Sequence, residues 1–328
     1  MRVLNEKDYR LFEQLVSLTE MELLKSMSMY LKNKYDNVIT TKDYIIAIGE
    51  LPIALVAHMD TVFKVPVSDL YYDRKKGVLW SPQGLGADDR AGVFAIIKIL
   101  QAGFRPTIIL TTGEESGGIG ACAITTKYPD CPVNGLKYMI QLDRHGTNDC
   151  VFYDCYCPEF VDYVESFGFC ERWGSFTDIS FLMPAWSIVG VNLSVGYEDE
   201  HSTTEILNVA PLLDTISKVK KMLSEKDIPD FKYDEDIRYS AGNWWKHAQV
   251  YGQHCSKCKK LFSEYELFPV LGLDKNVKYW CPDCLVDGAE WCDMCSEAYE
   301  VKERTGGKKI CSECAEDMAN LCAMTQNS

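Results

Sequence analysis

The sequence is poor in basic residues: 34 Lys and Arg stand against 48 Asp and Glu, giving a net charge of −14 over 328 residues. A nucleic-acid-binding surface needs clustered positive charge, so we expect no nucleic-acid partner. No apolar run approaches the roughly 18–20 residues that cross a bilayer, and no apolar segment follows the charged first ten residues, as it would in a signal peptide. We therefore expect a cytoplasmic protein without a membrane contact.

Cysteine is unevenly distributed. None of the 15 cysteines lies between residues 171 and 254, and nine follow residue 254. In a cytoplasmic protein such residues are thiols and metal ligands rather than disulfides. A polar, acidic stretch around 225–238 precedes the cysteine-rich tail. The composition thus predicts a large domain over residues 1–225, a linker over 226–250 and a small zinc-stabilised domain over 251–328.

The large domain alternates between strand-like and helical patterns. Apolar residues at helical spacing predict an opening helix over 6–33, and β-like runs at 44–48 and 53–58 flank a hairpin signal at 49–52. Further strands are expected at 107–111, 138–142 and 188–193, and helices at 91–100, 119–127, 158–167 and after Asn208. This alternation predicts an α/β fold of three layers, α/β/α, around a mixed, mainly parallel sheet.

Five segments at predicted strand or helix ends carry metal-binding residue types. They are AHMDT at 57–61, GADDRAG at 86–92, TGEESGG at 112–118, QLDRH at 141–145 and EHSTTE at 200–205. Residues two apart on an extended segment point the same way, so Asp60 can orient His58 and leave its other nitrogen for a metal. Each segment alone is also compatible with a polar strand end, a helix cap or solvated surface carboxylates.

Together and in this order, the five segments resemble the co-catalytic di-zinc exopeptidase superfamily. Its members include peptidase T, the glutamate carboxypeptidase-like deacylases and the compact bacterial aminopeptidases, and the resemblance covers about residues 40–225. It implies one zinc ion on His58, Asp88 and Asp143, and a second on Asp88, Glu115 and His201, with Asp88 bridging.

The resemblance also assigns the remaining roles. Asp60 would orient His58, and Glu114 would be the general base in peptide-bond hydrolysis by a metal-bridging water. The peptide bond between Asp88 and Asp89 would be cis, and cobalt or manganese would be able to replace the two catalytic zinc ions. The expected substrate of the protein is therefore a peptide or a small amide.

The spacing of the segments bears on the kind of enzyme. His58 and Asp88 are 30 positions apart, and Asp143 and His201 are 58 apart, so neither interval has room for the lid or dimerisation domain of larger relatives. The chain resembles the compact form, in which aminopeptidases predominate. Ser175-Phe176-Thr177-Asp178 stands where relatives place substrate-pocket residues, which implies a substrate contact for Thr177 and Asp178.

The tail contains four CxxC pairs, which is typical of two structural zinc sites. The pairs are Cys255/Cys258, Cys281/Cys284, Cys292/Cys295 and Cys311/Cys314. Sequential pairing of the four CxxC pairs would give zinc-ribbon or treble-clef-like modules, whereas interleaved pairing would give a cross-brace. The spacing does not decide between the two, and we favour sequential pairing. Redox chemistry is the alternative use of CxxC, and the acidic balance favours a protein as the partner of this module.

Three functions remain open at this point. The first is a zinc-dependent exopeptidase, specifically an aminopeptidase. The second is an amidohydrolase or deacylase that uses the same site on N-acyl amino acids. The third is a non-catalytic adaptor that carries the zinc module, although an intact set of ligand and base residues speaks against it.

Overall fold

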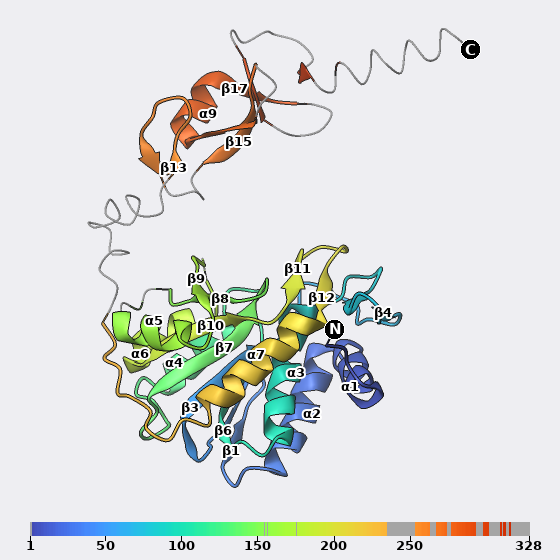
Figure 1. Ribbon diagram of the computed structural model, residues 1–328, viewed down its shortest axis with the longest axis vertical. Helices are drawn as coiled ribbons and strands as arrows, with labels where there is room; N and C mark the ends of the chain where they lie inside the picture. The colour runs from blue at the N-terminus through green and yellow to red at the C-terminus, as the bar shows by residue number, and fades with distance from the viewer. Residues whose placement is uncertain are drawn as a thin grey trace. The chain divides into compact units, whose positions relative to one another are not determined.

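The computed structural model describes residues 2–153, 155, 157–174 and 176–234, followed by 253–262, 267–273, 277–292, 298–301, 309, 311, 312 and 315. The chain divides into two compact units, Met1–Glu235 and Asp236–Ser328. Figure 1 shows both units, and each is described here by itself. No helix in the described ranges combines the length and the apolar character that a membrane crossing requires.

An eight-stranded sheet forms the centre of the first unit, in the order β1-β2-β6-β3-β7-β10-β8-β9. The strands are β1 (Val38–Thr40), β2 (Tyr44–Ala47), β3 (Leu51–His58), β6 (Pro106–Thr111), β7 (Tyr138–Arg144), β8 (Asp149–Val151), β9 (Cys170–Glu171) and β10 (Val189–Ser194). Strands β6, β3, β7 and β10 run parallel, whereas β2 and β8 are antiparallel to their inner neighbours. The expected mixed, mainly parallel sheet is confirmed. Because both faces are covered, every residue of β6 and β10 is buried.

Helices cover both faces of this sheet, which gives the expected three layers (Figure 1). One face carries α1 (Glu6–Val16), α2 (Glu20–Lys32), α3 (Ala87–Gln101) and α7 (Val209–Met222), and the other carries α4 (Ile119–Lys127), α5 (Pro158–Glu165) and α6 (Ile179–Trp186). The single opening helix expected over 6–33 is wrong, because Thr19 starts a new helix. Its hydroxyl accepts the Glu22 N–H while the Glu22 carboxylate accepts the Thr19 N–H, which is a capping box.

The hairpin expected at residues 49–52 is also wrong. In the described sheet β6 lies between β2 and β3, antiparallel to the first and parallel to the second. The Glu50 and Leu51 N–H groups donate to the Arg105 carbonyl, at 2.9 and 3.3 Å. A Cβ atom on Gly49 would lie 2.3 Å from the Arg105 oxygen, so only glycine allows this close crossing over the start of β6. The chain does reverse direction between β2 and β3, as the turn signal predicted, but the two strands do not pair because β6 lies between them.

A small second sheet belongs to the same unit and was not expected from the sequence. It has the order β11-β12-β5-β4, from β4 (Tyr71–Asp73), β5 (Val78–Trp80), β11 (Tyr197–Glu198) and β12 (Ile206–Asn208). Strands of two or three residues are too short to show a period of two. The connection between β11 and β12 contains His201, so this sheet positions one of the predicted ligands.

The second unit has a small core of its own. Strands β13 (Gln253–His254) and β14 (Leu261–Phe262) form a hairpin, and β15 (Phe268–Leu271), β16 (Val277–Trp280), β17 (Ala289–Trp291) and β18 (Ala298–Glu300) form a sheet that packs with helix α9 (Pro282–Gly288). Its buried cluster contains Leu267, Val270, Trp280 and Ala298, together with Cys255 and Cys281. A core this small needs support from metal ions or cross-links to stay folded.

Candidate active site

The predicted site residues come from the carboxyl ends of neighbouring parallel strands. His58 ends β3 and is level with Thr111, the last residue of β6, while Val56 is level with Gln141 of β7. Glu114 therefore follows the end of β6, and Asp143 lies near the end of β7, at the same edge of the sheet. Sites in such sheets form at this edge, where the strands give way to loops.

Asp88 stands at the centre of the site. Its Oδ1 lies 3.1 Å from His58 Nε2, which is also 3.4 Å from Asp143 Oδ1. Its Oδ2 lies 3.2 Å from His201 Nε2, which is also 3.0 Å from Glu115 Oε2. The structure thus brings together all five predicted ligands, with one oxygen of Asp88 turned toward each histidine.

These donor groups fit divalent metal ions. Nitrogen and oxygen ligands about 2.0–2.1 Å from a tetrahedral zinc ion lie about 3.3–3.4 Å from one another, close to the spacings around His58. Sets of His, Asp and Glu atoms here, among them His58, Asp88 and Glu115, lie within 4.8 Å of one another. Glu115 Oε1 is buried, and in the described part of the chain it has no hydrogen-bond partner. A metal ion would satisfy that oxygen.

The carboxylates and imidazoles of the site shift one another's pKa values. Burial, reinforced by neighbouring carboxylates, raises the pKa of Glu114 to about 9 and that of Glu115 to about 7. Burial opposes protonation of His58, but the surrounding carboxylates raise its pKa well above the usual value. The hydrogen bond to Asp88 raises the pKa of His201 to about 9. This concentration of buried carboxylates beside two imidazoles suits a bound cation.

Asp60 links the first and third motifs. Its Oδ1 lies 3.2 Å from His58 Nδ1, although the pair is not aligned as a hydrogen bond. Its two carboxylate oxygens accept the backbone N–H groups of Glu114 and Glu115, at 3.1 and 3.0 Å. Asp60 therefore holds the loop that presents both of these glutamates, in addition to facing the imidazole.

Thr177 and Asp178, for which a substrate contact was expected, are both buried. Thr177 Oγ1 donates to Asp143 Oδ2 at 2.8 Å, and Asp178 Oδ2 accepts from Thr111 Oγ1 at 2.5 Å. Their exposed fractions are 1% and 0%, and neither lies on the wall of the cavity described below. In this structure the Thr177 hydroxyl orients a predicted ligand.

Two functional residues were not identified from the sequence. Glu205, 1% exposed, accepts the backbone N–H groups of Gly86 and Asp88 at 2.6 and 3.0 Å and so anchors the turn that carries the central carboxylate. Asp89 is fully buried and accepts the His58 N–H at 3.1 Å. Both belong to the motifs, as the last residue of EHSTTE and the second aspartate of GADDRAG. Only their fully buried placement, which the sequence does not reveal, distinguishes them from capping residues.

The glycines of GADDRAG have a local explanation. Gly86 adopts φ +62°, a left-handed conformation that favours glycine. A Cβ atom on Gly92 would lie 2.2 Å from the Leu142 carbonyl oxygen, so glycine lets α3 approach β7. The peptide bond between Asp88 and Asp89 is cis, as the resemblance implies.

A cavity of about 310 Å³ opens beside the ligands. Glu114, Glu115 and His201 lie on its wall, and the His201 side chain is 52% exposed, so the ligand set is accessible from solvent. His145 also lines the cavity and pairs with Glu200, with 2.6 Å between Nδ1 and Oε1. This volume is at the lower end of the roughly 300–1,000 Å³ that is typical of small-molecule sites, which favours a small substrate.

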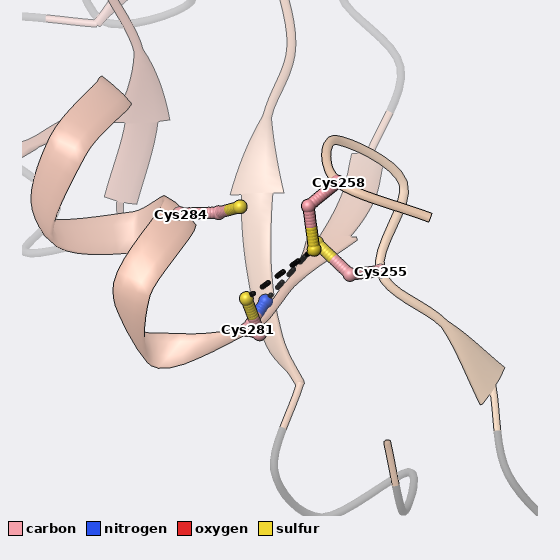
Figure 2. Close-up of side chains that lie close together, drawn as sticks. All are labelled: Cys255, Cys258, Cys281 and Cys284. Carbon is pink, nitrogen blue, oxygen red and sulfur yellow. Dashed lines mark hydrogen bonds between the residues drawn. The ribbon is translucent and has the colours of Figure 1, made fainter. Parts of the chain in front are cut away.

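Four cysteines of the second unit form a separate cluster. Figure 2 shows the side chains of Cys255, Cys258, Cys281 and Cys284 pointing toward one another, and their sulfur atoms all lie within 4.8 Å. The Cys258 and Cys281 sulfurs are 3.8 Å apart, which is the edge of about 3.8 Å expected for four thiolates about 2.3 Å from zinc. One pair comes from the turn after β13 and the other from the start of α9.

The cluster joins the first CxxC pair to the second, which is the sequential pairing. The Cys281 N–H donates to Cys255 Sγ at 3.4 Å, and the Cys311 N–H donates to Cys292 Sγ at 3.3 Å. The same backbone-to-sulfur bond thus joins the third pair to the fourth. Cys295 and Cys314, the other two expected ligands, lie outside the described residues.

Solved structures share the fold over about two thirds of this chain. Aminopeptidase PepT from Bacillus cereus is 17% identical to this chain with a TM-score of 0.51, and the match covers 67% of this chain and 98% of the PepT chain. A tripeptidase from Staphylococcus aureus is 16% identical with a TM-score of 0.52, and the match covers 68% of this chain and 98% of the tripeptidase chain. A TET aminopeptidase from a marine sediment archaeon, Thaumarchaeota archaeon SCGC AB-539-E09, is 13% identical with a TM-score of 0.54, covering 68% and 98%.

At these identities the likeness establishes the fold. No protein-family model matches the sequence, and no curated protein matches it. The activity must therefore be argued from the residues of the site.

Proposed function

We propose that this protein is a metal-dependent exopeptidase, specifically an aminopeptidase that uses two zinc ions. The observation that carries the proposal is the placement of Asp88, whose two oxygens face two different histidines, each beside a further carboxylate. Two metal positions that share one carboxylate suit hydrolysis of an amide bond. The names of the solved structures with this fold, two aminopeptidases and a tripeptidase, support the same conclusion.

The spacing of the donor atoms supports two metal positions. His58, Asp88 and Asp143 would hold one ion, and Asp88, Glu115 and His201 the other. When bound, such a pair of ions polarises the scissile carbonyl and makes water a better nucleophile. Cobalt or manganese would be able to take the same nitrogen and oxygen donors.

Glu114 is the proposed general base. It lines the cavity beside the ligands, and its backbone N–H is held by Asp60, so its carboxylate is presented from a fixed loop. The carboxylate would accept a proton from the attacking water and later deliver it to the nitrogen of the leaving amine. Asp60 and Thr177 act through their neighbours, by holding the Glu114-Glu115 loop and Asp143 respectively.

A digest of a peptide library with the full, metal-loaded chain tests the proposal. We expect residues to be released one at a time from the amino terminus, and aminoacyl amides to be cleaved in preference to N-acylated amino acids. Cleavage of only the N-acyl amino acids would make the protein a deacylase that uses the same site. The absence of any hydrolysis at full metal loading would favour the non-catalytic adaptor.

For the second unit we propose two structural zinc ions and a protein partner. The Cys255–Cys258–Cys281–Cys284 cluster supports the first ion. The hydrogen bond from the Cys311 N–H to Cys292 Sγ, which repeats the arrangement of the first cluster, supports the second ion.

Glu205→Ala should weaken metal binding and activity by about 10- to 100-fold, the usual cost of losing a group that orients a ligand. The change removes the acceptor for the Gly86 and Asp88 N–H groups, so Asp88 loses its anchor. Metal titration and steady-state kinetics provide the two readouts. Glu198→Ala is the matched control, since the side chain of this exposed glutamate accepts a bond from Asn208 alone in the described part of the chain. Equal metal affinity for Glu205→Ala and the unaltered protein would refute the anchoring role.

A chain that ends at residue 235 should fold and remain active, because every proposed ligand and the base precede that point. A chain that ends at residue 225 should be less stable by about 2 kcal/mol or more, since it loses Phe231. That ring packs on Phe160 and Tyr163, with centroids 4.9 and 5.3 Å away. Chemical denaturation of the two chains measures the difference. Equal stability would show that residues 226–235 are dispensable, and an insoluble 1–235 chain would show that the second unit is required.

A further inference from the structure

The connection between α1 and α2 contacts the loop of the third motif, although it belongs to none of the five motifs. Glu20, the first residue of α2, accepts the Gly113 N–H with its Oε1 atom at 3.0 Å. Glu20 and Gly113 are 93 positions apart, and Gly113 directly precedes the proposed base Glu114. Helix α2 therefore reaches the loop that presents the base.

Glu20 extends a row of acceptors along this loop. Asp60 accepts the N–H groups of Glu114 and Glu115, at 3.1 and 3.0 Å, so three successive backbone N–H groups, 113–115, each donate to a carboxylate. Hydrogen bonds to a charged acceptor are stronger than those to a neutral one. The backbone of the loop is thus held by two carboxylates from different elements, of which Asp60 belongs to a motif and Glu20 does not.

The same connection is also tied to the motif GADDRAG. Arg90, which is 2% exposed, donates from its guanidinium to the carbonyl groups of Leu15 and Leu18, at 3.2 and 3.1 Å. The rigid fork of the guanidinium suits two acceptors at once. The second motif therefore fixes the turn between α1 and α2, and this turn in turn fixes the third motif through Glu20.

The Glu20 carboxylate lies in an unfavourable position for a negative charge. Burial raises the pKa of Glu20 and the neighbouring Asp60 raises it further, although the Gly113 N–H opposes the shift. Both carboxylates lie on the wall of a cavity of about 220 Å³, so on this side side-chain packing does not hold the loop. A residue that disfavours the folded state but fixes a loop is expected where function rather than stability determines the residue.

We propose that Glu20 is a positioning residue for the general base: by holding the Gly113 N–H, it sets the position from which the Glu114 carboxylate reaches the attacking water. This inference rests on the proposed function, since it concerns the base of that site. Proton transfer needs both partners within hydrogen-bond reach, and a misplacement of about 1 Å can slow a reaction about 10²-fold. Glu20 is not on the wall of the cavity beside the ligands, so it acts through the backbone of the loop.

Three variants of the full, metal-loaded chain test the proposal. Glu20→Ala removes the acceptor and should lower kcat by about 10- to 100-fold, while KM and zinc content stay within about threefold. Glu20→Gln keeps an oxygen for the Gly113 N–H and loses the repulsion with Asp60, so it should keep kcat within about threefold and melt no lower. Glu22→Ala is the matched control. It breaks the capping box at the same end of α2, where Glu22 accepts the Thr19 N–H at 2.9 Å, and should lower the melting temperature with kcat unchanged.

Two results of these measurements would overturn the proposal. If Glu20 only supported α2, Glu20→Ala would behave like Glu22→Ala, with a lower melting temperature and an unchanged kcat. Equal slowing of Glu20→Ala and Glu20→Gln would make the charge of the side chain, rather than its acceptor oxygen, the determinant.

Hydrogen exchange of the backbone amides of 112–118 tests the contact independently of activity. Glu20→Ala should speed their exchange by about 10-fold or more, and Glu22→Ala should leave it unchanged. Faster exchange in Glu20→Ala, in a protein whose unaltered form hydrolyses no peptide, would retain the positioning of the loop and reject the peptidase. Peptide hydrolysis with a normal kcat in Glu20→Ala would reject the positioning role and retain the peptidase.

Discussion

Glu114→Gln is expected to lower kcat by about 10²–10⁴-fold or more while the metal content stays unchanged. Glutamine keeps the shape of the side chain but has no carboxylate to accept a proton. The backbone N–H of residue 114 would still donate to Asp60, at 3.1 Å in the unaltered protein, so the loop keeps its position. Both proton transfers, from water and to the leaving amine, are lost together, which places the expected effect at the upper end of the range.

Glu115→Ala is the matched comparison, because the two glutamates are adjacent on one loop. Glu115 Oε2 lies 3.0 Å from His201 Nε2, so its removal should reduce metal occupancy rather than the rate of the metal-loaded enzyme. Kinetics and bound zinc should be measured side by side for the two variants. Near-normal activity of Glu114→Gln at full metal loading would refute the mechanism even if the metal site were correct.

The site could be predicted because its residues follow buried strands. The strand ending at His58 is apolar up to that residue, the strand before Glu114 contains the buried apolar run 108–110, and a parallel sheet brings their ends to one edge. The order of the motifs along the chain was therefore enough to indicate that the residues meet. The resemblance then divided the ligands between two metal positions, and the two oxygens of Asp88 agree with that division.

Contacts between segments distant in sequence could not be predicted in the same way. Glu205 and Asp88 are 117 positions apart, and nothing in either motif indicates that one anchors the backbone of the other. The hairpin expectation failed for the same reason, since β6 is inserted from more than fifty positions away. The contact of Thr177 with Asp143 likewise depends on burial and on a partner distant in sequence, and neither property has a periodic signal.

We predict that the chain binds close to four zinc ions and that mild chelation separates them into two classes. The His and carboxylate ligands lie beside an open cavity, and the His201 side chain is 52% exposed, so a chelator can reach them. Cys255 and Cys281 are buried at 0% and 1% in the core of the second unit, so zinc bound there would be coupled to folding. We therefore expect two ions to leave first and all activity to leave with them, followed by recovery when metal is returned.

Cobalt substitution allows both classes to be followed at once, because thiolate-to-cobalt charge-transfer absorption reports only the cysteine sites. This absorption should persist through the chelation step that abolishes hydrolysis. Cys281→Ser reverses the test: it removes one sulfur of the cluster and should diminish the absorption while hydrolysis by the first unit continues. Two or fewer metal ions in carefully purified protein, or simultaneous loss of absorption and activity, would contradict a division into two catalytic and two structural ions. Parallel loss of activity in Cys281→Ser would instead make the cysteine module part of the catalytic machinery.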